Sequence, residues 1–132
     1  MTGVFEGPTA EEMMQADKFT SVKHTALENR DGASTRELLA ISFPKCFAGK
    51  GEQKWPIKIG IDRDIKAAMP ELSRNQIRRA LGDYCGGPTY HRAILTKCGR
   101  VDLQGKYAGI VREHDVTFAQ ARLDQINRKN SK

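Results

Sequence analysis

The chain has 132 residues, a formal net charge of +6 and a hydrophobic content of 39%. This length suits one domain with its own core. The sequence has neither an apolar run long enough to cross a membrane nor a signal peptide, so we expect a soluble cytoplasmic protein. Its three cysteines form no CxxC pair and are odd in number. That pattern favours reduced thiols over a disulfide framework.

Charge is distributed unevenly along the chain. Residues 1–35 carry six acids and three bases, a balance of −3, whereas residues 36–132 carry 19 bases and ten acids, a balance of +9. A basic folded part indicates a polyanionic partner, although a basic surface can also be merely solvated. We expect residues 1–33 to be a flexible or loosely docked acidic extension, with at most a short helix near Met13. This extension either solubilises the protein or folds back over the basic part and competes with weakly bound nucleic acid.

The first clear helix signal is a capping box formed by Ser34 and Glu37. It predicts a helix that begins at Ser34 and ends near Ser42, because Pro44 disfavours helical geometry in the residue before it. Residues 49–56 contain two glycines and a proline, which predicts a loop.

Three further helices are predicted between residues 61 and 96. We expect Asp62 to cap the first and Pro70 to end it. Its apolar positions are Ile61, Ile65, Ala68 and Met69. Ser73 is the predicted N-cap of the next helix, which extends to about Tyr84. Pro88 is well placed to begin another short helix.

The last part of the chain predicts a hairpin and a helix. Residues 100–103 and 106–110 flank a Gln-Gly turn and indicate a small β-hairpin. A helix over residues 113–127 follows, and its predicted inner face holds Val116, Ala119, Leu123 and Ile126. The predicted architecture is therefore mainly α, with about five helices and one small β-hairpin.

The helix that begins after Ser73 carries the strongest functional signal. Its first turn has free backbone N–H groups, which bind anions. Arg74 and Arg78 are spaced i and i+4 and share one face, while Ile77 and Leu81 can pack on another. This arrangement predicts contact with the phosphate backbone of a nucleic acid.

Other side chains extend this prediction. Lys58 precedes the second predicted helix, Arg63 and Lys66 lie on it, and Arg100 heads the hairpin. Tyr90 follows a Gly-Gly-Pro turn, where an exposed ring could stack on a base. Core packing for the tyrosine and solvated charge for the basic residues are the alternatives.

The sequence gives little support to catalysis or metal binding. Cys85, His91, Cys98 and His114 match no zinc spacing, and no family-specific pattern surrounds Cys46 or Cys85 as a nucleophile. Neither a phosphate-binding P-loop nor a dinucleotide fingerprint occurs. We therefore expect a protein that is not an enzyme and has no cofactor, metal or small-molecule substrate.

Several short motifs, in order and almost without gaps over residues 36–126, resemble the ProQ/FinO family of RNA chaperones. They are Phe43-Pro44-Lys45-Cys46-Phe47, Pro56-Ile57-Lys58-Ile59-Gly60-Ile61, Asp64, Leu72-Ser73-Arg74, Gln76-Ile77-Arg78, Ala80-Leu81, Tyr84, Tyr90, Arg100-Val101-Asp102-Leu103, Gly105 and Gly109. The resemblance implies a FinO/ProQ-like RNA-binding domain over residues 34–127, between the extension 1–33 and a short basic tail 128–132. This organisation is that of a minimal FinO-domain protein.

The resemblance also implies a partner and a site. Such a protein binds structured RNA, especially intrinsic-terminator hairpins with 3′ single-stranded uridine tails of small RNAs and mRNAs. It stabilises them and promotes RNA–RNA pairing in post-transcriptional regulation, and we expect it to act as a monomer. The start of the Ser73 helix would contact stem phosphates, and Tyr90 with Arg100 would form the pocket for the 3′-terminal nucleotides. The full predicted RNA-binding set is Lys58, Arg63, Lys66, Ser73, Arg74, Asn75, Arg78, Arg79, Tyr90 and Arg100.

The chain departs from the family pattern at two places. Gly82 falls where a bacterial relative carries a further arginine, so the basic stripe is shortened. Gly87-Pro88 also changes the segment before Tyr90, and Arg79, Arg92 or Lys97 are candidates to compensate. A DNA-binding regulator and a basic adaptor that binds an acidic protein remain the alternative functions.

Overall fold

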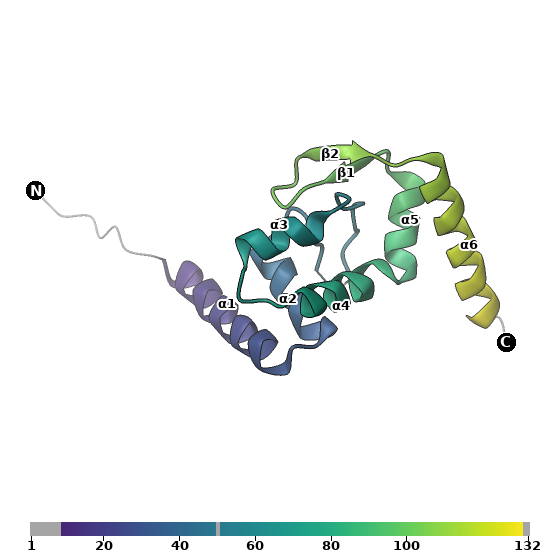
Figure 1. Ribbon diagram of the computed structural model, residues 1–132. Coiled ribbons are helices and arrows are strands. Elements are labelled where there is room, and N and C mark those ends of the chain that lie inside the picture. Colours follow the sequence, from purple (N-terminus) through teal and green to yellow (C-terminus); the bar gives the residue numbers. More distant parts are fainter. Residues whose placement is uncertain (1–8, 50, 131–132) are drawn as a thin grey trace, which may run out of the picture.

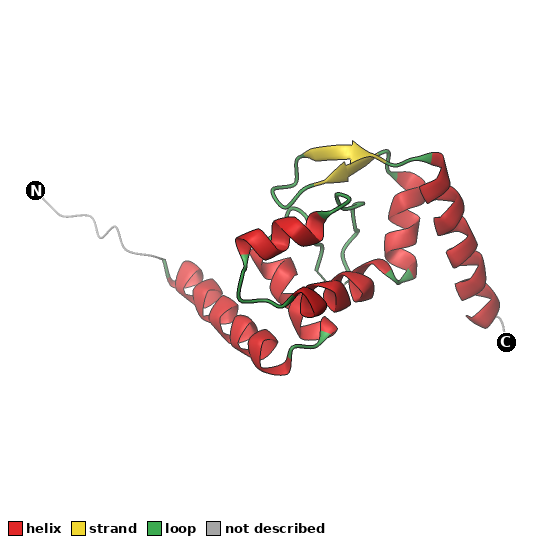
Figure 2. Ribbon diagram, in the orientation of Figure 1, coloured by secondary structure: helices red, strands yellow, loops and turns green. Residues whose placement is uncertain are grey.

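The computed structural model describes residues 9–49 and 51–130, which form six helices and one two-stranded hairpin (Figures 1 and 2). The mainly helical architecture agrees with the prediction, and the helix beyond the expected five is the first. The elements in chain order are α1 (Ala10–Asn29), α2 (Gly32–Ser42), α3 (Ile61–Ala68), α4 (Arg74–Cys85), α5 (Pro88–Thr96), β1 (Gly99–Val101), β2 (Tyr107–Ile110) and α6 (Glu113–Asn130).

The prediction of at most a short helix within residues 1–33 is wrong, because α1 covers Ala10–Asn29. It runs for 20 residues from its N-cap Thr9, whose hydroxyl accepts a hydrogen bond from the Glu12 N–H at 3.1 Å. Along this helix only Ala26 is fully buried, which agrees with the lack of a sustained apolar stripe in its sequence. Residues 1–8 lie outside the described part. The division of the chain at residue 34 stays a prediction.

Helices α2 and α4 pack against each other at the centre of the molecule, and α1 and α3 flank them (Figure 1). The N-cap of α2 is Asp31 instead of Ser34, because the Asp31 carboxylate accepts from the Ser34 N–H at 2.7 Å. Gly32, the first residue of α2, lies against α4. A Cβ there would lie 2.8 Å from the carbonyl oxygen of Arg79 on α4, so only glycine lets the two helices approach this closely.

Helix α3 begins directly after its N-cap Gly60, and the predicted side-chain cap from Asp62 is absent. Gly60 has a φ of 85°, a left-handed conformation that favours glycine, and it turns the chain into the helix. Ile61 and Ile65 are buried as expected, whereas Ala68 is exposed. The predicted end before Pro70 is confirmed.

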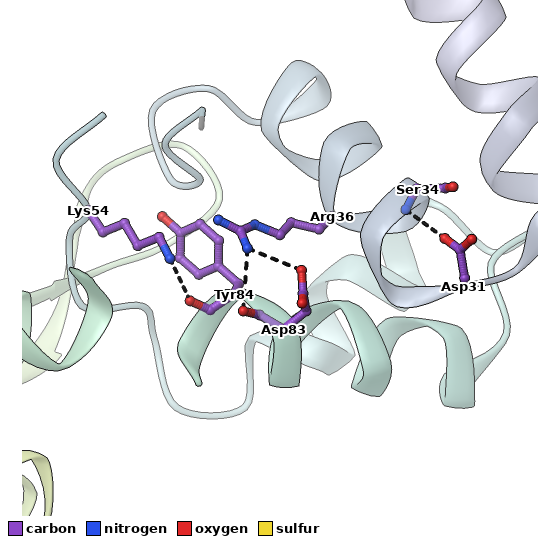
Figure 3. Close-up of polar contacts among 6 residues, drawn as sticks. All are labelled: Asp31, Ser34, Arg36, Lys54, Asp83 and Tyr84. Atoms are coloured by element: carbon purple, nitrogen blue, oxygen red, sulfur yellow. Dashed lines mark hydrogen bonds and ion pairs between the residues drawn. The ribbon is translucent and has the colours of Figure 1, made fainter. Parts of the chain in front are cut away.

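Tyr84, on the last turn of α4, lies between two cations (Figure 3). Lys54 Nζ is 4.4 Å and Arg36 Cζ is 5.3 Å from the ring centroid. Lys54 also donates to the Tyr84 carbonyl oxygen at 2.8 Å, and Arg36 pairs with Asp83 at 3.1 Å. The Tyr84 hydroxyl accepts from the Ala48 N–H at 2.9 Å. These contacts attach Ala48 and Lys54 to the last turn of α4.

The C-terminal third comprises α5, the hairpin and α6. Strands β1 and β2 are antiparallel with Val101 opposite Tyr107, and Val101 also bridges Ile57. Helix α6 packs on α5 through Ala119 and Leu123, whereas Val116 is 37% exposed and does not lie on the inner face. The helix continues to Asn130, three residues beyond the predicted end.

Helices α1 and α6 lie at opposite ends of the molecule (Figure 1). The core between them is built from large side chains with under 2% exposure on α2, α3, α4 and the loops that join them. They include Leu38, Leu39, Phe47, Ile65, Leu72, Ile77 and Tyr84. Among the described helices, none has the length and apolar character needed to cross a membrane.

Candidate nucleic-acid interface

The N-terminus of α4 is exposed and has a complete capping box. The Ser73 hydroxyl accepts from the Gln76 N–H at 3.1 Å, and the Gln76 side-chain oxygen accepts from the Ser73 N–H at 3.5 Å. The first i→i−4 bond runs from the Ile77 N–H to the Ser73 carbonyl at 3.0 Å. The N–H groups of Arg74 and Asn75 precede this bond, and both side chains are exposed. The predicted N-cap and helix are therefore confirmed, and the positive end of the helix dipole is at the surface.

Two arginines lie along one side of α4. Arg74 and Arg78 are exposed and one helical turn apart. Arg79 is also exposed, but adjacent helical positions point in different directions, and its backbone borders Gly32 of α2. Gly82 is exposed, and a Cβ there would meet nothing within 4 Å. The stripe therefore ends at Arg78 for lack of a side chain and not for lack of space.

The three predicted basic residues near α3 have different environments. Lys58 pairs with Asp64 at 2.8 Å and keeps 39% of its side chain exposed. Lys66 donates to the carbonyls of Pro70 and Leu72, both at 2.7 Å, and so holds the connection from α3 to α4. Arg63 is exposed. Lys66 thus stabilises the connection just before the N-terminus of α4, whereas the Arg63 side chain is exposed to solvent.

Arg100 is almost fully buried, with 7% of its surface exposed. One terminal nitrogen donates to the Ile57 carbonyl at 2.9 Å, and the other pairs with Asp115 on α6 at 3.0 Å. Its Nε has no hydrogen-bond partner among the described residues. Burial acts to raise the pKa of the Asp115 carboxyl, but the Arg112 N–H and the Arg100 guanidinium outweigh it and hold that pKa below its usual value.

Tyr90 is also buried, and the expectation of an exposed ring is wrong. The residue is 7% exposed, and its hydroxyl accepts from the Ile57 N–H at 3.1 Å. Pro88 begins α5, and Tyr90 in its first turn points inward, where its ring centroid lies 5.9 Å from that of Tyr84. Burial raises the pKa of Tyr90 to about 12. The ring is therefore not available for stacking as it stands, although it still lines a pocket.

That pocket, which we call the α5–α6 pocket, lies between α5, β1 and α6 and has a volume of about 420 Å³. Tyr90 and Arg100 line it, as the prediction of a joint site requires. Among the other residues that line it are His91, which the sequence analysis weighed only as a metal ligand, and Asp115 and Phe118, which it did not single out. The sequence signal for His91 is its place next to Tyr90. The pairing of Asp115 with Arg100 depends on how α6 packs, which the sequence does not show.

Helix α4 joins the two parts of the candidate interface. Its N-terminus carries Arg74 and Asn75, and its last residue, Cys85, lines the α5–α6 pocket. Twelve residues of helix are about 18 Å long. A rigid helix therefore sets the separation between the anion-binding end and the pocket.

Two of the three cysteines have surroundings that make their thiols unreactive. All three are free thiols, and burial raises the pKa of Cys46 to about 12 and that of Cys85 to about 11. Both thiols are therefore protonated at neutral pH and weakly nucleophilic. Over residues 9–49 and 51–130, no three His, Cys, Asp or Glu side chains are grouped to hold a metal ion.

Comparison with known proteins identifies the family. The sequence profile of the ProQ/FINO family matches residues 33–132. The chain belongs to the ProQ/FinO family. The RNA chaperone ProQ of Vibrio vulnificus is 37% identical over 94 residues, which are 69% of this chain and 45% of that protein. ProQ of Aliivibrio fischeri strain MJ11 is 34% identical over 103 residues, which are 74% of this chain and 49% of that protein. The chain thus spans about half the length of these curated relatives.

Two solved structures share the ProQ/FinO fold with this chain. A FinO-like RNA chaperone from Neisseria meningitidis superposes with a TM-score of 0.60 at 22% identity, over 91% of this chain and 98% of that one. A ProQ homolog from Legionella pneumophila gives a TM-score of 0.61 at 29% identity, over 72% of this chain and 82% of that one. The predicted FinO-like architecture is confirmed.

Proposed function

We propose that this protein is an RNA chaperone that binds hairpins with a 3′ single-stranded uridine tail, such as intrinsic terminators at the ends of small RNAs and mRNAs. It stabilises these RNAs and promotes RNA–RNA pairing without catalysing a reaction. The observation that carries the proposal is the N-terminus of α4, where exposed Arg74, Asn75 and Arg78 surround free backbone N–H groups. The RNA chaperones among its relatives support the same function.

The helix end suits the stem of a hairpin. An A-form duplex hides its base edges in a narrow major groove, so proteins recognise it by its backbone and 2′-hydroxyls. Backbone N–H groups and arginines bind phosphates without sequence preference. Ser73, Arg74, Asn75 and Arg78 would therefore contact the stem backbone, with Lys58, Arg63 and Arg79 at the margins. Lys66 would support them by holding the connection before α4.

The α5–α6 pocket suits the end of the tail. Tyr90 and Arg100 line it, and a pocket can accommodate a chain end more readily than the middle of a strand, which must leave in two directions. Since α4 fixes the separation of the two parts, specificity would be for a structure, a stem followed by a short tail, more than for a sequence. We place this activity in the cytoplasm, where the free thiols remain reduced, and assign it to the monomer.

A competition binding assay tests the proposal. The probe is a terminator hairpin with a uridine tail, and the competitors are the same hairpin without its tail and duplex DNA of the stem sequence. We expect the tailed hairpin to bind most tightly and its affinity to fall steeply with salt, because phosphate contacts release counterions. Preference for duplex DNA would instead support a DNA-binding regulator. Absence of RNA binding, with salt-sensitive binding of an acidic protein, would support an adaptor.

A further inference from the structure

A second pocket, of about 480 Å³, lies on the other face of the hairpin from the α5–α6 pocket. Successive side chains of a strand point to opposite faces of a sheet. Arg100 of β1 lines the α5–α6 pocket, and its neighbour Val101 lines the second one. We call the second one the hairpin pocket, and the residues around it include Lys45, Trp55 and Gly105.

Two exposed aromatic rings lie on this face. Trp55 is 46% exposed, and Tyr107 of β2 is 71% exposed. Ile57 forms a parallel bridge with Val101, and the same register continued by two residues puts Trp55 beside Gly99. A Cβ on Gly99 would lie 3.1 Å from the ring of Tyr107, so this ring covers the glycine. Exposed aromatic rings gathered on one surface are typical of binding sites.

Lysines surround the two rings. Lys97 Nζ lies 4.3 Å from the centroid of the tryptophan ring. Lys45 lines the hairpin pocket, Lys106 precedes β2, and both side chains are exposed. Glu52 and Asp102 add negative charge, but both carboxylates already accept hydrogen bonds from backbone N–H groups. Aromatic rings among cations suit a polymer of planar bases and phosphates.

The chemistry of this surface favours a single strand over a duplex. Bases in a duplex are stacked on one another, whereas unpaired bases turn outward and stack on aromatic side chains. The tail of the hairpin RNA would end in the α5–α6 pocket, on the opposite face of β1. A strand bound at the hairpin pocket is therefore a different one.

We propose that Trp55, Tyr107, Lys45 and Lys97 form a second RNA-binding site, which holds a single-stranded segment of a second RNA. One base stacks on the ring of Trp55, and the two lysines contact the neighbouring phosphates. The inference rests on RNA binding in the proposed function and adds a second strand to it. Two RNAs that are to pair are then held on one protein molecule.

Trp55 is the single tryptophan of the chain, so its fluorescence reports on this site directly. The protein is first saturated with the tailed hairpin, which fills the site of the proposed function. A short oligocytidine with a chemically blocked 3′ end is then added. We expect the oligocytidine to quench the tryptophan fluorescence and to saturate, because a stacked base lies against the indole ring.

Substitutions of Trp55 separate stacking from simple apolar contact. Trp55→Leu should weaken binding of the oligocytidine to the hairpin-saturated protein at least about fivefold, the effect of one stacked base. Trp55→Phe keeps a planar ring and should retain most of the affinity. Fluorescence anisotropy of a labelled oligocytidine measures both, and circular dichroism checks the fold. If Trp55→Leu does not fold, Tyr107→Ala replaces it, with a loss of affinity expected.

Met14→Ala is the matched control for the loss of an exposed apolar side chain. Met14 is 71% exposed on α1, and its substitution should leave the affinity for the oligocytidine unchanged. The affinity for the tailed hairpin should be the same in the wild type, Trp55→Leu and Met14→Ala. An equal fall of hairpin and oligocytidine affinity in Trp55→Leu would mean that the ring belongs to the hairpin site, and the second site would be wrong.

The remaining outcomes distinguish this inference from the proposed function. Binding of the oligocytidine through Trp55 without binding of the tailed hairpin contradicts only the proposed function. Binding of the hairpin without quenching by the oligocytidine contradicts only the second site. Displacement of the oligocytidine by an acidic peptide at equal concentration would overturn the inference in favour of a surface that binds an acidic protein.

Discussion

The side-chain amide of Gln76 donates a hydrogen bond to the backbone carbonyl of Ala26 at 2.8 Å, which ties the start of α4 to the end of α1. The same nitrogen donates to the Thr35 hydroxyl on α2 at 2.9 Å, and the amide oxygen accepts from the Ser73 N–H. Gln76 is 2% exposed. One buried amide therefore joins three helices immediately behind the surface that we propose binds the RNA stem.

Replacement of Gln76 by alanine should lower the free energy of unfolding by about 1–3 kcal/mol, because it removes the hydrogen bonds of a buried amide to Ala26 and Thr35 and leaves a cavity. Urea unfolding measures this change. RNA affinity should fall as well, since the N-terminus of α4 loses its support. Gln104→Ala is the matched control because Gln104 is exposed in the hairpin turn, and its stability should stay within about 0.5 kcal/mol of the wild type. Equal stability of the two variants would show that Gln76 does not hold the helices together.

The Arg100–Asp115 pair should make stability depend on pH. The pKa of Asp115 is held below its usual value, so its contribution to stability is present above about pH 4, the pKa of an unfolded aspartate. It is lost as the pH falls through the lower pKa of the folded state. We therefore expect Asp115→Asn to be less stable than the wild type at pH 7 and the difference to shrink by pH 3. Urea unfolding at the two pH values measures this change.

Asp124→Asn on the same helix is the control for this pH dependence. Asp124 is exposed and accepts a hydrogen bond from the Gln120 amide one turn away, so its substitution should change stability little at either pH. A constant difference between Asp115→Asn and the wild type from pH 7 to pH 3 would contradict a role for the carboxylate charge.

Local sequence signals predicted the parts of the interface that depend on neighbouring residues. Ser73 and the i, i+4 spacing of Arg74 and Arg78 were sufficient to locate α4 and its exposed face. Tyr90 shows the limit of such signals, since a Gly-Gly-Pro turn is compatible with a ring that points outward or inward. Packing against Tyr84 decides this orientation, and that contact is not local in sequence.

The start of α2 and the existence of α1 were missed for different reasons. Ser34 and Glu37 form a valid capping pattern, but the Asp31 carboxylate accepts from the Ser34 N–H and caps the helix three residues earlier. The apolar period of helix α1 is weak, since only Ala26 needs to be completely buried along it. Its end is held by Gln76, which lies 50 residues away in sequence. A competing local cap thus determines the start of α2, whereas α1 is held by a tertiary contact near its end.

Charge reversal at Arg78 should weaken RNA binding with little effect on the fold. Arg78 is exposed, and we propose that it contacts a stem phosphate. Arg78→Glu should lower the affinity for the tailed hairpin at least about tenfold. It should also reduce the slope of log affinity against log salt by about one. Filter binding over a series of salt concentrations measures both quantities, and circular dichroism checks the fold.

Arg128→Glu makes the same charge change at an exposed position in the last turn of α6. It should reduce affinity much less than Arg78→Glu does, because only long-range attraction is altered. Equal losses in the two variants would mean that net charge, and not a contact on α4, accounts for the effect. Arg100 is unsuitable for this test because reversal of a buried, paired charge disrupts the fold itself.

Extension of the basic stripe should strengthen RNA binding. Gly82 is one turn beyond Arg78, is exposed, and has open space where a Cβ would lie, so Gly82→Arg places a third cation in line. Removal of glycine from a helix interior should raise the free energy of unfolding by about 1 kcal/mol in both Gly82→Arg and Gly82→Ala. Only the arginine variant should bind the tailed hairpin more tightly, by about tenfold, and with a steeper salt dependence. If Gly82→Ala gains the same affinity, helix stability explains the effect, and the stem does not extend along α4 beyond Arg78.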